Sequence, residues 1–281
     1  MPDGSGKLCN DTNGGPDTEA TRWPIGATLM PDKVNVLISY VDVCVYSPHI
    51  IFVVEGWGFT EYNWQTNQLS VPPVDVFPPS ADGAGIPSSE FFGSPIVSGH
   101  NITFFSLTCC GLGGSIYATT IPSHLAALEN PASYVPQPIS GVPETFSLSV
   151  SPPSHAQPHL TMYWSADSAG GCRIYTAPAA LGPWTETASG TLPKCATSQY
   201  PCICIYPHPE LSTTSRLVVS YYVPGYGPGV AGHPYPHSPI NHVVLASIPN
   251  VINNLDRSAS KLPSNPVFQD PYIQMNAFRH G

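Results

Sequence analysis

The sequence predicts an all-β fold, a β-propeller built of four-stranded antiparallel blades. Only 10% of the 281 residues are charged, and the chain holds 34 prolines and 24 glycines. That composition is typical of strands joined by turns and unlike that of a helical protein. Hydrophobic residues make up 42% of the chain, enough for a sizeable core. The decisive observation is that one pattern of strands recurs four times.

Each repeat has a short strand of small residues, a polar turn, a strand of aromatic and β-branched residues, a Gly/Pro loop and another strand. Units of about 50 residues with several strands are typical of propeller blades. A two-sheet sandwich also has a strand about every 10 residues, but it does not repeat this order four times. The repeats span residues 22–62, 92–134, 146–188 and 205–249. Equivalent places in the second strands are held by Ser39, Ser106, Trp164 and Ser220. The residues expected on the innermost strands are Pro24, Pro95, Val150 and Pro209.

The rest of the chain is assigned by composition. Residues 1–20 are interpreted as an irregular segment, 21–249 as the propeller domain and 250–281 as a polar segment that closes the ring or wraps the surface. Helices are scarce. One or two helical turns are expected over Ser123–Asn130, with Ser123 as the N-cap.

The net charge is −9, from 18 acidic and 9 basic residues. This charge argues against a nucleic-acid partner, because phosphates need a basic surface. No apolar run approaches the roughly 20 residues that a membrane-spanning helix requires. A polysaccharide or oligosaccharide is the expected partner, and the chain is expected to be monomeric and to need no cofactor.

Eight cysteines and few lysines favour an extracellular, secreted protein, although no signal peptide is visible in this chain. Buried free thiols are the alternative. Cys195 is expected to form a disulfide with Cys202 or Cys204. The adjacent Cys109 and Cys110 are not expected to pair with each other, since neighbours in a strand point to opposite faces.

Several phrases of the sequence resemble a known family. They are Ile174–Trp184, Tyr206–Ser212 followed by Leu217–Tyr221, Phe92–Pro95, and Leu128–Tyr134. In order and spacing they resemble secreted five-bladed β-propellers called domain of unknown function 4185. Some members of that family are linked to endo-D-arabinanase activity on cell-wall arabinan. The resemblance covers Thr21 to Pro249, and it implies a glycoside hydrolase that acts on furanosyl polysaccharide.

The chain departs from the family at its start. The family has one more blade before the Trp-Pro blade, with an early Gly-Asp element that holds acidic residues, and no such element precedes Trp23 here. The resemblance therefore implies a five-bladed type whose first blade is missing or incomplete. A truncated chain of this kind is expected to be unstable and inactive alone. In the alternative of a complete chain, the ring closes with four blades or stays open, and catalysis rests on Glu210, Glu90 or Asp42.

Glycoside hydrolysis needs two carboxylates, one acting as acid and the other as nucleophile or base. Glu210, Glu90 and Asp42 are the candidates. Glu210 follows His208 by two residues, so both side chains would lie on one side of a strand and His208 could orient the carboxylate. The alternatives are a structural turn for Glu210, a solvated loop for Glu90 and a solvated strand end for Asp42.

Substrate binding is assigned to Trp23, His208, Trp57 and Ser94. An indole near the mouth of a propeller is a good sugar platform. Trp23 has an equally strong alternative as a core residue between blades. Trp57 is interpreted as an exposed loop residue because Gly56 and Gly58 flank it.

A metal site is not expected. His233, His237 and His242 are spaced as ligands on a helix would be, but the Gly/Pro-rich segment that holds them cannot be helical. Two other functions stay open: a carbohydrate-binding propeller that has lost its acids, and a structural or adhesive extracellular protein.

Overall fold

A computed structural model describes residues 18–46, 51–78, 93–107, 115–143, 147–155, 157–165, 171–192, 203–223 and 242–249. The chain divides into two compact units, each with its own hydrophobic core. Unit 1 comprises Met1–Cys109 and Ile116–Pro138, and unit 2 comprises Cys110–Ser115 and Ile139–Gly281.

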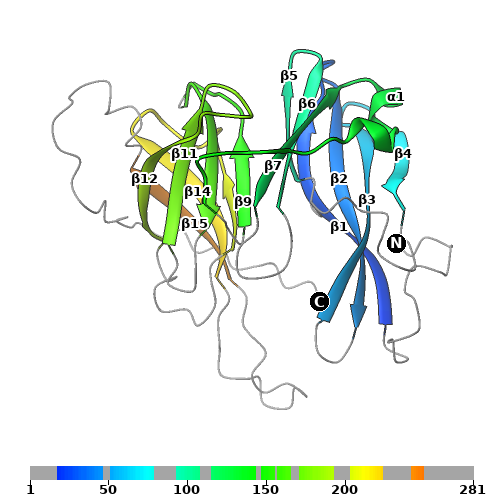
Figure 1. Cartoon of the computed structure of the whole chain (residues 1–281), viewed down its shortest axis with the longest axis horizontal. Helices are drawn as coiled ribbons and strands as arrows, with labels where there is room; N and C mark the ends of the chain where they lie inside the picture. Colours follow the sequence, from blue (N-terminus) through cyan, green and yellow to red (C-terminus); the bar gives the residue numbers. More distant parts are fainter. Residues whose placement is uncertain are drawn as a thin grey trace. The chain divides into compact units, whose positions relative to one another are not determined.

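Unit 1 contains two antiparallel sheets of four strands each (Figure 1). The first is formed by β1 (Thr18–Leu29), β2 (Asn35–Tyr46), β3 (Ile51–Asn63) and β4 (Gln68–Phe77). The second is formed by β5 (Gly93–Ser98), β6 (Asn101–Leu107), β7 (Ile116–Pro122) and β8 (Gln137–Pro138). In both sheets the strands are hydrogen-bonded in chain order.

Unit 2 contains the other two sheets among the described residues. One is formed by β9 (Ser147–Ser151), β10 (Leu160–Ser165), β11 (Gly171–Ala177) and β12 (Thr185–Thr191). The other is formed by β13 (Ile203–Pro207), β14 (Arg216–Val223) and β15 (His242–Pro249). Within unit 1 the first strands β1 and β5 lie against each other, as do β9 and β13 within unit 2.

These sheets confirm the predicted fold class. The described chain is an all-β protein of the β-propeller class, and its four antiparallel sheets are the blades. Two details differ from the expectation. Strand β1 already begins at Thr18, inside the segment interpreted as irregular. Pro209 lies in the turn after β13 and not on a first strand, because β13 ends at Pro207.

The small helical element of the connection β7–β8 is also present, but its cap is not the predicted one. Helix α1 (Leu125–Leu128) is followed by the 3₁₀ turn η1 (Pro131–Ser133). The N-cap is His124, whose Nδ1 accepts a hydrogen bond from the backbone N–H of Ala127 at 3.2 Å. Ser123 instead donates its backbone N–H to the carbonyl of His100, which fixes the end of β7.

Prolines mark irregular pairing at the start of two blades. The register between β1 and β2 shifts between Pro24 and Gly26, and that between β5 and β6 shifts between Gly93 and Ile96, across Pro95. A proline cannot donate to the ladder and is tolerated within a sheet mainly at edges and bulges. The Pro-containing first strands are therefore compatible with a blade because each is bulged at the proline.

The core of unit 1 is centred on Trp57, which has no exposed surface. Its ring makes edge-on contacts with Phe104 (centroids 5.5 Å apart) and Tyr134 (5.2 Å) and a tilted contact with Phe77 (6.3 Å). Edge-to-face pairs of this kind add about 0.5–1.5 kcal/mol each beyond the burial of their surface. The prediction that Trp57 is an exposed loop residue is therefore wrong, since it lies within β3 and joins the two sheets of unit 1.

The glycines beside Trp57 have a different role from the one inferred. Gly56 pairs with Asp42, and Gly58 pairs with Tyr40 on one side and Asp75 on the other. Side chains alternate along a strand, so both glycines lie on the face opposite the indole. There the Tyr40 ring crosses β3 directly above Gly58. The glycines leave room for neighbouring side chains and do not mark a loop.

The core of unit 2 is formed by side chains of β10, β11, β13, β14 and β15, with alternate residues of β14 and β15 contributing most of them. Its largest fully buried side chains are Tyr163 and Tyr221. Cys172 lies in this core as a buried free thiol, and burial raises its pKa to about 12. At this position the alternative of a buried free thiol holds. Cys109, Cys110, Cys195 and Cys202 lie outside the described residues, and so does the side chain of Cys204.

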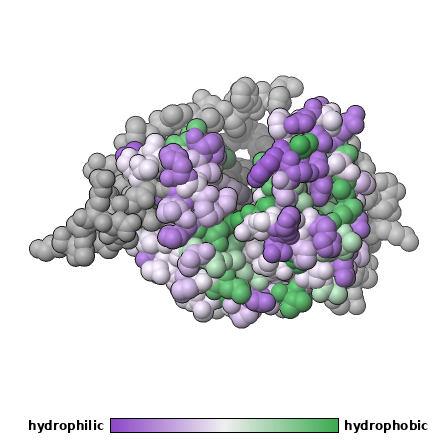
Figure 2. Space-filling view, turned by 90° about the horizontal axis from the view of Figure 1, so that it is seen from above, coloured by the Kyte–Doolittle hydropathy of each residue, from purple (hydrophilic) through white to green (hydrophobic). Residues whose placement is uncertain are grey.

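Hydrophilic residues are prominent on the face drawn in Figure 2, with hydrophobic residues between them. In the described part of the chain no helix has the length and apolarity needed to cross a membrane. The large exposed hydrophobic residues include Trp64 in unit 1 and Tyr206 and Val243 in unit 2.

Gly58→Ala tests the crossing of β3. A Cβ at this position would overlap the carbonyl oxygen of Val74 and lie 2.5 Å from the Tyr40 hydroxyl. We expect the substitution to lower the free energy of unfolding by about 1–3 kcal/mol, measured by urea denaturation. Gly93→Ala is the matched control, because its Cβ would lie 3.4 Å from the nearest atom. Equal stability of the two variants would contradict the packing described for β3.

Candidate functional site

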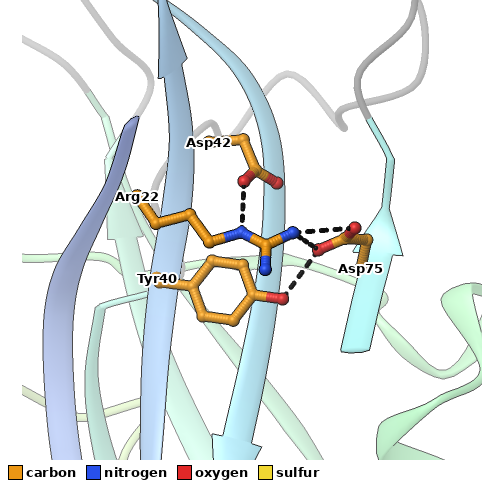
Figure 3. Close-up of polar contacts among 4 residues, drawn as sticks. All are labelled: Arg22, Tyr40, Asp42 and Asp75. Atoms are coloured by element: carbon orange, nitrogen blue, oxygen red, sulfur yellow. Dashed lines mark hydrogen bonds and ion pairs between the residues drawn. The ribbon is translucent and has the colours of Figure 1, made fainter. Parts of the chain in front are cut away.

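The first candidate cluster is a set of polar contacts on the sheet of β1–β4 (Figure 3). Strand pairing places it on the face opposite Trp57, since Val41 is the residue of β2 that pairs with the indole. Arg22 of β1 donates from Nε to Oδ1 of Asp42 on β2 at 2.8 Å. Its Nη2 donates to both carboxylate oxygens of Asp75 on β4, at 2.9 and 3.0 Å. The guanidinium lies 4.8 Å from the centroid of the Tyr40 ring, and the Tyr40 hydroxyl donates to Asp75 at 2.7 Å. One cation on β1 thus bridges two carboxylates, one on β2 and one on β4.

Burial and charge set the protonation states in this cluster. Partial burial alone would lower the pKa of Arg22, but the hydrogen bond to Asp42 and the surrounding negative charges raise it. The pKa of Tyr40 is raised, first by burial and then by its hydrogen bond to Asp75. Arg22 therefore stays cationic and Tyr40 stays a neutral donor throughout the physiological range.

The location of Asp42 corrects the expectation of a solvated strand end. Asp42 lies within β2, its residue is 2% exposed, and it is ion-paired to Arg22. A carboxylate that is buried and neutralised in this way is poorly placed to give a proton to a substrate. The geometry instead fits a structural ion pair, which costs several kcal/mol when one partner is removed.

The second cluster lies in unit 2, at the turn between β13 and β14. His208 Nδ1 lies 3.1 Å from Oε1 of Glu210, and His208 Nε2 lies 2.9 Å from Oγ of Ser220 on β14. The Glu210 side chain is 64% exposed and that of His208 is 30% exposed. The contact expected between His208 and Glu210 is therefore present. It arises in a turn and not along a strand, since both residues follow the end of β13.

Hydrogen bonds to backbone groups fix the conformation of this turn. The N–H of His208 donates to the carbonyl of Val218 at 2.8 Å. Ser212 Oγ donates to the carbonyl of His208 at 2.7 Å and accepts the N–H of Val218 at 2.9 Å. The backbone of His208 and the hydroxyl of Ser212 are thus both hydrogen-bonded to Val218 of β14. The result is an oriented imidazole that holds a solvent-accessible carboxylate.

Tyr206 lies beside this cluster on the same face of the sheet. It pairs directly with Ser220 across β13 and β14, and its residue is 46% exposed. Directly paired residues of antiparallel strands point to the same face. An exposed phenol ring on the face of Ser220 offers a flat apolar surface on the same side of the sheet as the hydroxyl that contacts His208.

The other predicted site residues are not brought to either cluster by the described structure. Trp23 lies on β1 next to Arg22 and is 37% exposed, so it is neither a core residue nor fully free in solvent. Ser94 lies in β5, but its side chain is outside the described residues. Glu90, His233 and His237 lie wholly outside them, and so does the side chain of His242.

Sequence reasoning missed Arg22, Asp75, Ser220 and Tyr206 as site residues. Ser220 carried a signal, because it was recognised as a repeated position of the second strands, but it was not linked to His208. The alternation of β14 could have made that link, since Val218 and Ser220 share a face and the carbonyl of Val218 anchors His208. Asp75 carried no comparable signal, because β4 was not recognised.

Among the described residues, no three His, Cys, Asp or Glu side chains gather as metal ligands would. The remaining acidic side chain described in unit 2 is Glu186, which is held by Arg173 at 3.3 Å and by the Tyr175 hydroxyl at 3.2 Å. Glu210 is thus the described carboxylate of unit 2 that is not engaged by a cationic arginine.

No protein-family model matches the chain, and no curated protein matches it. The resemblance to the domain of unknown function family therefore rests on the quoted phrases alone. Several solved structures are similar. The GH32 β-fructofuranosidase BmSUC1 of Bombyx mori is 10% identical, with a TM-score of 0.45 over 80% of this chain and 45% of that chain.

The GH43_1 enzyme from Xanthomonas citri, complexed with xylotriose, is 11% identical, with a TM-score of 0.47 over 81% of this chain and 70% of that chain. A glycosyl hydrolase from Bacteroides ovatus is 12% identical, with a TM-score of 0.42 over 82% and 67%. The chain spans less than half the length of the Bombyx mori enzyme. The site of this chain has to be judged on its own geometry.

Arg22→Met tests the ion pair of unit 1. The substitution leaves Asp42 buried without its cation, so we expect the free energy of unfolding to fall by about 3 kcal/mol, measured by urea denaturation. The double variant Arg22→Met, Asp42→Asn should regain most of this loss. Arg173→Met is the control, because that pair is 43% and 38% exposed, and its loss should cost less than about 1 kcal/mol. Equal losses for Arg22→Met and Arg173→Met would overturn the structural role of the pair.

Proposed function

We propose that the chain is a glycan-active propeller that hydrolyses furanosyl polysaccharide in the manner of an endo-D-arabinanase, with Glu210 as its proton-donating carboxyl group. One observation carries the proposal: Glu210 is exposed, and its carboxylate is nevertheless held in place by His208. The implied substrate class comes from the resemblance of the sequence phrases, including the one that contains both residues.

Glycosidic bond cleavage requires a carboxylic acid that reaches the leaving oxygen and keeps its orientation. Glu210 meets both demands, since its side chain is 64% exposed and Oε1 lies 3.1 Å from the imidazole. Asp42 meets neither, because it is buried and paired with Arg22. Of the three carboxylates named from the sequence, the proposal therefore retains Glu210 and leaves out Asp42.

The reaction needs a second carboxylate on the other side of the scissile bond. Glu186 is held by Arg173 and Tyr175 and is a poor candidate. Glu90 is the remaining candidate from the sequence. Tyr206 is assigned as the sugar platform, because its exposed ring shares a face with Ser220 and lies two residues before His208. It takes the role first given to Trp57, whose ring is buried.

A second function is favoured by the state of Asp42. If the carboxylates other than Glu210 serve only structure, the same cluster would bind a glycan without cleaving it. An imidazole, a carboxylate and a phenol ring are all suited to sugar hydroxyls and C–H faces. Binding of furanosyl polymers without release of reducing ends would support this alternative.

Glu210→Gln tests the catalytic assignment. The amide keeps the shape of the side chain but cannot donate the proton, so we expect hydrolysis of arabinan to fall by about 10²–10⁴-fold, measured as reducing-end release. Glu186→Gln is the control and should retain activity near that of the wild type. Undiminished hydrolysis by Glu210→Gln would remove Glu210 from the mechanism.

Tyr206→Ala tests the sugar platform. Loss of the ring should weaken binding of an arabinan oligosaccharide by about 3- to 10-fold, measured by isothermal titration calorimetry, and Tyr206→Phe should bind nearly as well as the wild type. Trp64→Ala is the control, because Trp64 is an exposed aromatic residue of unit 1, 53% exposed. Unchanged affinity in Tyr206→Ala would show that the ring does not contact the ligand.

A further inference from the structure

Ser220 extends the Glu210–His208 contact into a chain of three side chains. Glu210 Oε1 lies 3.1 Å from His208 Nδ1, and Ser220 Oγ lies 2.9 Å from His208 Nε2. A neutral imidazole has one N–H donor and one acceptor nitrogen. The hydrogen-bond partner at one nitrogen therefore determines whether the other nitrogen donates or accepts a hydrogen bond.

A hydroxyl is suited to both tautomers, because it can donate or accept a hydrogen bond without moving its oxygen. In a neutral imidazole with its proton on Nδ1, that N–H donates to Oε1 of Glu210, and the Ser220 hydroxyl donates to Nε2. The other carboxyl oxygen of Glu210, Oε2, is then the one that carries the proton to be transferred.

The separation of Ser220 from His208 is set by the backbone. Ser220 lies within β14 and is paired with Tyr206 on β13 and Leu245 on β15. His208 is anchored to the same strand through the carbonyl of Val218. Ser220 is half-buried, so its hydroxyl is only partly open to water. This contact therefore joins two groups that the sheet already holds in place.

We propose that Ser220 is a positioning residue that keeps His208 oriented while Glu210 releases and regains its proton. The inference rests on the proposed function of Glu210. As the glycosidic C–O bond breaks, the proton on Oε2 of Glu210 moves to the leaving oxygen, and the anomeric carbon forms its new bond to the second carboxylate or to water. Before and after this transfer Nδ1–H donates to Oε1 and the Ser220 hydroxyl donates to Nε2, so no proton leaves the ring.

An isosteric pair of variants separates the hydroxyl from the space that it fills. Ser220→Thr keeps the hydroxyl and Ser220→Val lacks it, while both add a β-branched side chain that a strand accepts well. We expect Ser220→Thr to resemble the wild type. In Ser220→Val, kcat on arabinan should fall by about 10- to 100-fold with little change in KM, because Glu210 is less well placed. The pH profile of kcat should also change in Ser220→Val alone.

The ¹⁵N spectrum of His208 gives a readout that does not need hydrolysis. With labelled histidine, and with the signal assigned by its loss in His208→Gln, the two ring nitrogens should appear as separate protonated and unprotonated signals in the wild type and Ser220→Thr. In Ser220→Val they should average. Separate signals and unchanged kcat in Ser220→Val would overturn the role of Ser220. A different outcome would refute the proposed function alone: the wild type shows separate signals, Ser220→Val shows averaged signals, and the wild type does not hydrolyse arabinan. Ser220 would then still orient the ring of His208.

Discussion

Strand β3 of unit 1 has to carry the largest side chain of the core on one face and almost nothing on the other. Trp57 fills the core between the two sheets, and Gly56 and Gly58 leave the opposite face free. The Tyr40 ring crosses this space to reach Asp75, and Arg22 completes the bridge to Asp42. The packing of both faces of the first sheet thus depends on three consecutive residues.

The two units keep carboxylates in place in different ways. In unit 1, Asp42 is buried, and without the cation of Arg22 its charge would destabilise the fold. The ion pair therefore serves to hold β1 and β2 together. In unit 2, Glu210 stays in solvent, and the imidazole of His208 orients it. A carboxyl group exposed to solvent changes its protonation state more readily than one in a buried ion pair. For this reason we propose the proton-donating group in the turn after β13 and not on β2.

The sequence was sufficient to predict what depends on repetition and on local pattern. Four recurring units predicted the blades, and the spacing of His208 and Glu210 predicted their contact, although that contact forms in a turn and not along a strand. The sequence was insufficient where the burial and the partners of a side chain depend on a strand far away in sequence. Trp57 was misassigned because glycines that accommodate Tyr40 resemble a loop, and Asp42 was misassigned because its partner Arg22 is 20 residues distant.

The positions of the indoles have an optical consequence. Trp57 is completely buried in unit 1, and Trp184 is 5% exposed in unit 2, where its Nε1 donates to the carbonyl of Ala180 at 2.9 Å. Trp23 and Trp64, at 37% and 53% exposure, emit from a more aqueous environment. Each unit therefore contains a buried indole whose emission shifts to longer wavelength when water reaches it. With phenylalanine in place of Trp57, unit 1 would keep only its exposed indoles, and the spectral shift of the chain would report mainly on the unfolding of unit 2.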